Sequence, residues 1–148
     1  ANLSISMGGR AAEELVIEDI TTGAVGDIKH ATDIARKMVM EWGMSELGPV
    51  YYGSNQEVFL GRDYQSTHTY SESVATKIDE AVAALVETAH KDAVKKLTEH
   101  RAVMDCMVRL LIERETIYTE EVDMIMEGKP YEEVRDALDA RLAKKYNN

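Results

Sequence analysis

The sequence has few of the residues that cross-link a chain, interrupt helices or bind nucleic acid. Its 148 residues include one cysteine, Cys106, and two prolines, and no run of roughly 18 apolar residues occurs. The single cysteine excludes an internal disulfide, and the missing apolar run excludes a membrane-spanning helix within these residues. Lysine and arginine total 17 against 27 acidic residues, a net charge of −10. Because no basic cluster occurs, we expect no nucleic-acid partner.

Hydrophobic residues make up 45% of the sequence, which is enough for a core in a chain of this length. Apolar residues recur mostly at spacings of three and four, which is the period of an α-helix. We therefore predict a mainly α, helical bundle-like fold, with residues 1–148 forming a single domain.

The apolar spacing and the residues that flank it predict where each helix lies. The predicted helices cover residues 1–15, 24–42, 72–97, 100–113, 120–127 and 131–145. The predicted N-caps are Thr21 or Thr22, Ser71 and Thr119, and the predicted C-terminal glycines are Gly43 and Gly128. The helices over 72–97 and 100–113 are expected to pack as an antiparallel pair. Around residues 50–60 we predict a short hairpin or irregular loop.

The first residues favour a chain that is cut from within a larger domain. Residues 1–15 have a helical composition, yet they begin without an initiator methionine and carry Gly8 and Gly9 in their middle. The two glycines are expected to allow close packing of another element, because they carry no side chain.

Two blocks near the amino end are the most informative part of the sequence. They read MGGRAAEEL at residues 7–15 and TTGAVGDIKHAT at residues 21–32, followed by WGMS at 42–45, LGP at 47–49 and VFLGR at 58–62. In this order they resemble the peptidase domain of the FtsH-type ATP-dependent zinc metalloproteases. The resemblance extends to about residue 126 and is weaker beyond Gly128.

The resemblance implies a metal ligand in this chain. In that family zinc is bound by two histidines of a His-Glu-x-x-His helix and by a later aspartate, which corresponds to Asp27. The glutamate of the histidine motif is the general base that takes a proton from water. An aspartate in the first turn of a helix suits a metal ligand, since the positive end of the helix favours its ionised form.

The resemblance also implies properties of the intact protein. It would be an ATP-dependent zinc metalloendopeptidase that degrades unfolded and membrane proteins and assembles as a homo-hexamer. ATP and magnesium would bind to an ATPase module that these residues do not contain. A membrane anchor would likewise lie outside them, with the peptidase domain in the cytoplasm.

The histidine motif is missing from these residues. The four histidines are His30, His68, His90 and His100, and no two of them have the spacing of the motif. We expect the motif upstream, so Asp27 would supply coordination only. The isolated chain is therefore expected not to cleave peptides.

Several alternatives remain open at this point. Glu13 could orient the metal ligands without binding the metal itself. Alternatively, it could tie the helix that carries Arg10 to a neighbouring helix through a salt bridge or hydrogen bond. His30 lies three residues after Asp27 and could form a metal site with it that needs no upstream segment. The whole chain could instead be a non-catalytic oligomerisation or adaptor module.

Overall fold

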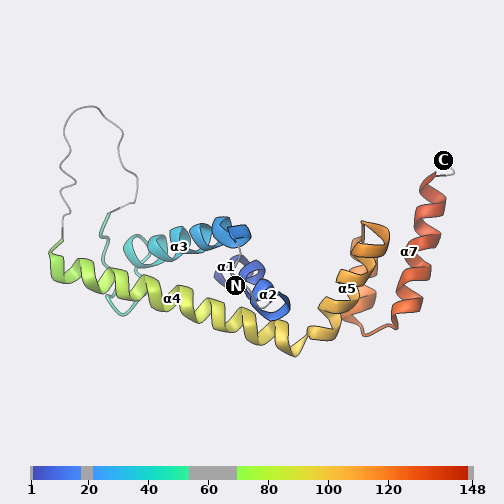
Figure 1. Cartoon of the computed structure of the whole chain (residues 1–148). Helices are drawn as coiled ribbons and strands as arrows, with labels where there is room; N and C mark the ends of the chain where they lie inside the picture. The colour runs from blue at the N-terminus through green and yellow to red at the C-terminus, as the bar shows by residue number, and fades with distance from the viewer. Residues whose placement is uncertain (1, 18–21, 54–69, 147–148) are drawn as a thin grey trace. The chain divides into compact units, whose positions relative to one another are not determined.

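The computed structural model describes residues 2–17, 22–53 and 70–146, and the regular structure within these ranges is entirely helical. The elements are α1 (Asn2–Ser6), α2 (Gly8–Val16), the 3-10 helix η1 (Thr22–Ala24), α3 (Val25–Met40), α4 (Glu72–Glu99), α5 (Arg101–Arg114), α6 (Thr119–Met126) and α7 (Tyr131–Tyr146) (Figure 1). The predicted mainly α fold is confirmed.

The chain divides into two compact units, which we call unit 1 (Ala1–Lys96) and unit 2 (Leu97–Asn148). Helix α4 lies almost wholly in unit 1, and α5 lies in unit 2. The expected antiparallel packing of these two helices, and the expectation of a single domain over 1–148, stay predictions.

The helix bounds follow the apolar spacing closely, and the predicted glycines end the helices. Gly43 and Gly128 have φ of +63° and +80°, the left-handed conformation that glycine adopts without strain. Ser71 caps α4, because its Oγ accepts a hydrogen bond from the N–H of Val74 at 3.4 Å. The predicted first helix is interrupted at Met7, where α1 gives way to α2.

Two of the predicted N-caps are wrong. Helix α3 follows η1 directly, so its N-cap is Ala24, which makes no side-chain cap bond, and Thr22 lies within η1. Thr21 lies outside the described residues. The N-cap of α6 is Tyr118 rather than Thr119, and its N–H donates to Oε2 of Glu121 at 3.1 Å.

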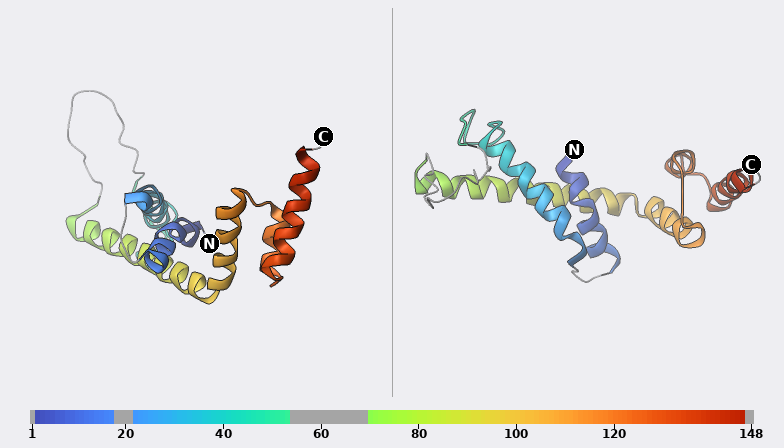
Figure 2. Two further views of the ribbon diagram at one scale, coloured as in Figure 1. Left: turned by 45° about the vertical axis from the view of Figure 1, so that its right-hand side comes forward. Right: turned by 90° about the horizontal axis from the view of Figure 1, so that it is seen from above.

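In unit 1, α1, α2 and α3 pack against one another, and residues of α2, α3 and α4 line one groove. The right-hand view of Figure 2 shows α3 crossing α4. The buried apolar residues of the unit are mostly small. They are Leu3, Met7, Ala11, Ala24, Ala31, Ala35, Val39, Met40, Ile78, Val82, Ala89 and Ala93. Two side-chain contacts join the short helices to α4: Ser4 Oγ donates to Asp92 Oδ2 at 2.8 Å, and Glu14 Oε2 lies 2.9 Å from His90 Nε2.

Unit 2 is built from α5, α6 and α7 around larger aliphatic side chains. Its fully buried core consists of Leu110, Ile125, Val134 and Leu138. Partly buried residues that pack against this core include Val103, Met107, Ile117, Tyr131 and Leu142. Leu110, on the helix predicted over residues 100–113, is thus buried, whereas Leu111 on the same helix is 43% exposed.

The segment predicted as a hairpin or irregular loop is described only in part. Residues 50–53 form a loop without strands, and residues 54–69 lie outside the described residues. At the edges of the described ranges the rings of Tyr52 and Tyr70 pack edge to face, with their centroids 5.9 Å apart.

Candidate functional site

Asp27 lies in the first turn of α3, as predicted. Because Ala24 offers no capping side chain, Asp27 is the acidic residue that the positive end of this helix faces. The residue is exposed to solvent. Among the described residues its carboxylate makes no hydrogen bond and no ion pair. A negative charge therefore stands at a helix N-terminus with its oxygens open to an external ligand.

The nearest constraint on this carboxylate comes from α2. A Cβ atom built on Gly9 would lie 2.7 Å from Oδ2 of Asp27 and 3.9 Å from its Cγ. Asp27 is thus seated against a helix surface that has no side chain at that point. The close backbone packing expected at the glycine pair is not found: the atoms near Gly9 belong to the Asp27 side chain, and a Cβ at Gly8 would meet nothing within 4 Å.

One carboxylate can fill only part of a zinc site. A catalytic zinc ion takes three protein ligands and an open position. Among the described residues no group of three histidine, cysteine, aspartate or glutamate side chains could hold a metal ion. The alternative site at Asp27 and His30 therefore gains no third ligand from these residues. The described residues therefore hold no complete zinc site, and the solvent exposure of Asp27 and its freedom from competing partners suit the role of one ligand.

Glu13 lies one helical turn after Gly9 on α2, and its Oε2 atom is buried. The adjacent Glu14 ties the Arg10 helix to a neighbouring helix. Glu14 accepts a hydrogen bond from Nε of Arg10 at 2.8 Å and also reaches His90 on α4. The spacing of four between Arg10 and Glu14 is the sequence signal that indicates this pair. The role of Glu13 beside the metal stays a prediction.

A groove of about 870 Å³ lies between α2, α3 and α4 within unit 1. Apolar side chains such as Val25, Ile28 and Val82 line it, together with Arg10 and His90. Asp27 is not among its lining residues, so the groove and the candidate ligand are separate features of the unit.

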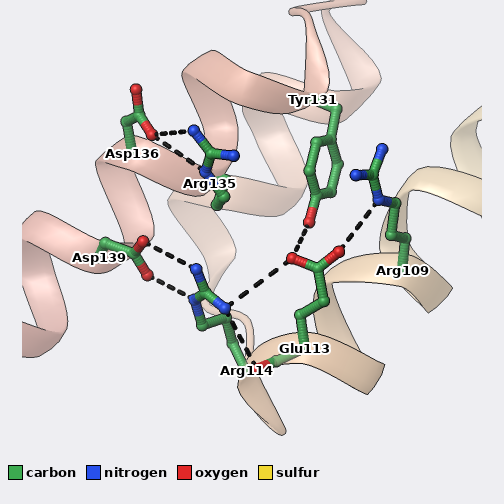
Figure 3. Close-up of polar contacts among 7 residues, drawn as sticks. All are labelled: Arg109, Glu113, Arg114, Tyr131, Arg135, Asp136 and Asp139. Carbon is green, nitrogen blue, oxygen red and sulfur yellow. Dashed lines mark hydrogen bonds and ion pairs between the residues drawn. The ribbon is translucent and has the colours of Figure 1, made fainter.

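Glu113 and Asp139 of unit 2 have partners that Asp27 lacks (Figure 3). Arg114 of α5 donates two hydrogen bonds to Asp139 of α7, at 2.6 and 3.0 Å, and this hydrogen bonding lowers the pKa of Asp139. The hydroxyl of Tyr131 and the guanidinium of Arg109 both donate to Glu113, and these hydrogen bonds lower its pKa. These two carboxylates join α5 to α7.

Comparison with known proteins gives a consistent picture. Residues 1–125 match the model of peptidase family M41. The chain is 48% identical over 132 residues to the ATP-dependent zinc metalloprotease FtsH 4 of Sorangium cellulosum, covering 87% of this chain and 20% of that protein. It is 48% identical over 133 residues to an ATP-dependent zinc metalloprotease FtsH of Magnetococcus marinus, covering 88% and 20%. The corresponding protein of Mycobacterium bovis is 51% identical over 127 residues, covering 84% and 17%.

The chain thus spans about a fifth of the length of these relatives. The matched region contains Gly9, Asp27 and all of unit 1, and it ends within unit 2 before α7 begins. In the part of the chain that the structure describes, no helix is both long and apolar enough to cross a membrane.

Proposed function

This chain belongs to peptidase family M41, and we propose that it is the distal part of the peptidase domain of an ATP-dependent zinc metalloendopeptidase, in which Asp27 is the third protein ligand of zinc. The relatives it matches are about five times longer and are named as enzymes of this kind. Residues 1–148 would then contribute one ligand, and an upstream His-Glu-x-x-His segment would contribute two histidines and the general base.

The observation that carries this proposal is the state of the Asp27 carboxylate. It stands in the first turn of α3, it is exposed, and it has no hydrogen-bond or ion-pair partner among the described residues. In unit 2, Asp139 and Glu113 are instead engaged by arginine and tyrosine. An ionised carboxylate with open oxygens is what a metal ligand requires.

In this proposal Asp27 holds the metal, and the metal supplies the chemistry. Bound zinc supplies a Lewis acid that polarises the scissile carbonyl and lowers the pKa of its water toward about 7. Asp27 contributes a negative charge and orientation, and it moves no proton. Since none of the four histidines has the motif spacing, residues 1–148 alone are expected to show no zinc-dependent proteolysis.

The intact protein is proposed to have the further properties of its family. It would bind ATP and magnesium in a separate module, act on unfolded and membrane proteins, and assemble as a homo-hexamer. An anchor outside these residues would attach it to the membrane, with this domain in the cytoplasm. The sequence upstream of residue 1 is the first check, because the proposal requires a His-Glu-x-x-His motif and an ATPase module there.

The decisive experiment replaces Asp27 with asparagine in the full-length protein. Asp27→Asn keeps the shape of the side chain and removes its charge. We expect zinc affinity and proteolysis to fall by more than the roughly 10–100-fold that loss of an outer-shell partner costs, while ATP hydrolysis is retained. Zinc content by mass spectrometry, cleavage of an unfolded protein and phosphate release measure the three quantities.

Asp33→Asn is the matched control, because Asp33 is an exposed acid on the same helix. It should leave zinc content and proteolysis at the wild-type level. If Asp27→Asn retained both as well, the chain would act as an assembly module and the proposed ligand role would be wrong.

A further inference from the structure

We infer that Gly9 is a positioning residue for zinc binding: its bare backbone sets where the carboxylate of Asp27 can lie. This inference rests on the proposed ligand role of Asp27. It assigns to α2, which supplies no ligand itself, the task of holding a ligand that α3 supplies.

The backbone conformation does not explain a glycine at this position. Gly9 is in helix α2, and the glycines with positive φ are Gly43, Gly48, Gly53 and Gly128 among the described residues. Within a helix glycine is less favourable than alanine, since it loses more backbone entropy on folding. What Gly9 offers instead is space, and the atom that occupies this space is Oδ2 of Asp27.

The required movement is large compared with the tolerance of a metal site. A Cβ at Gly9 would lie 2.7 Å from Oδ2, and ordinary contact begins at 3.4 Å, so the oxygen would have to retreat by about 0.7 Å. Zinc–carboxylate distances are about 2.0–2.2 Å, and a credible site keeps them within about 0.2 Å. A methyl group at residue 9 would therefore disturb coordination.

The same movement places little demand on the fold. Oδ2 is the end of a side chain, and the next atom that the added Cβ would approach is Cγ of the same residue at 3.9 Å. No backbone atom of α3 lies within 4 Å of the added Cβ. The carboxylate can turn aside while α2 and α3 keep their places, so zinc binding and stability should respond differently.

The neighbouring glycine provides a matched control. Gly8 is the preceding residue of the same helix, and a Cβ there would meet nothing within 4 Å. Gly8→Ala and Gly9→Ala make the same chemical change one residue apart, and only the second adds an atom against Asp27.

The test compares Gly9→Ala, Gly8→Ala and Asp27→Asn in the full-length protein. Zinc affinity is measured by competition with a chromophoric chelator, and the visible spectrum of the Co²⁺-substituted protein reports the coordination geometry. For Gly9→Ala we expect a roughly 10–100-fold lower zinc affinity, the range typical of groups that orient a ligand, with an altered Co²⁺ spectrum. The unfolding temperature of the metal-free protein should not fall. Gly8→Ala should match the wild type in all three measurements.

The outcomes separate this inference from the proposed function. If Asp27→Asn loses zinc while Gly9→Ala keeps wild-type affinity and spectrum, Gly9 does not position the ligand, and the proposed function stands. If Asp27→Asn itself keeps zinc, the proposed function is wrong. If Gly9→Ala loses zinc only together with a lower unfolding temperature of the metal-free protein, Gly9 serves helix packing and the inference is overturned.

Discussion

Asp27 of unit 1 differs from three acids of unit 2 in what its side chain contacts. In unit 2 the carboxylates of Glu113, Glu121 and Asp139 accept hydrogen bonds from arginine, tyrosine or backbone groups. In unit 1 the Oδ2 atom of Asp27 lies 2.7 Å from where a Cβ of Gly9 would stand, and among the described residues this carboxylate has no ionic partner. An acid that is engaged on several sides stabilises a fold, whereas one that is seated but unpaired is available to a ligand.

The buried residues of the two units also differ in size. Unit 1 buries mostly small side chains, of which Ala11, Ala31 and Ala35 are fully buried. Small residues let helices approach closely, and this closeness brings Gly9 against Asp27. Unit 2 instead buries leucine, isoleucine and valine. Stability should therefore depend more strongly on individual side chains in unit 2, and zinc binding on backbone proximity in unit 1.

The largest effect on stability is expected from the core of unit 2. Leu110 is fully buried, and Leu110→Ala should lower the free energy of unfolding by about 2–5 kcal/mol, through lost burial and the cavity left behind. Urea-induced unfolding of the chain measures this change. Leu111→Ala on the same helix is the control, because Leu111 is 43% exposed. The full-length Leu110→Ala protein should keep its zinc affinity, and a loss of zinc there would break the distinction between the units.

An intermediate effect is expected from the buried acid Glu121. Its side chain is 1% exposed and accepts hydrogen bonds from the N–H of Tyr118 and from Nε of Arg141 at 3.0 Å. Glu121→Gln removes the charge that both donors face, and it should cost about 1–3 kcal/mol of unfolding free energy. Glu120→Gln also removes a partner of Arg141, at 3.2 Å, from a more exposed position. Its loss should be smaller, and equal losses would contradict the importance of burial.

The smallest effect is expected from pH. Hydrogen bonds from Arg114 lower the pKa of Asp139 in the folded chain, so folding favours the ionised carboxylate. This contribution is complete above the unfolded pKa of about 3.9, and it is lost as the pH falls through the lower folded value. Asp139→Asn should therefore flatten the fall of the unfolding temperature at pH values below about 4.

Salt provides the check on this last prediction. Asp139 is 43% exposed on its side chain, so added salt should weaken the acid dependence of the wild type toward that of the variant. Identical pH profiles for the two proteins in dilute buffer would show that the Arg114–Asp139 pair contributes nothing measurable.

Much of the secondary structure could be predicted because it depends on local spacing. The helix predicted over 72–97 is α4 (Glu72–Glu99), and its buried residues Ile78, Val82, Ala89 and Ala93 follow the helical spacing. The caps at Ser71, Gly43 and Gly128 need only one residue type at a helix end. The wrong N-caps at Thr22 and Thr119 also have local causes. A short 3-10 turn precedes α3, and the N-cap of α6 lies one residue earlier than predicted.

The partners of side chains could not be predicted in this way. Glu14, rather than Glu13, joins α2 to His90, although both acids are adjacent in the sequence. Gly8 and Gly9 are likewise adjacent, and only Gly9 faces Asp27. Neighbouring positions on a helix point about 100° apart, so the choice between them depends on how α2 is rotated against α3 and α4.

The amino-acid sequence alone determined the helical period, most helix ends and the ordered motif blocks that assign the chain to its family and single out Asp27. These features are carried by residues close to one another along the chain. Only the tertiary structure decided that Asp27 is unpaired among the described residues and that its Oδ2 rests where Gly9 lacks a side chain. That contact joins residues 18 positions apart on two helices, and it exists because helix packing, rather than local spacing, sets the distance between them.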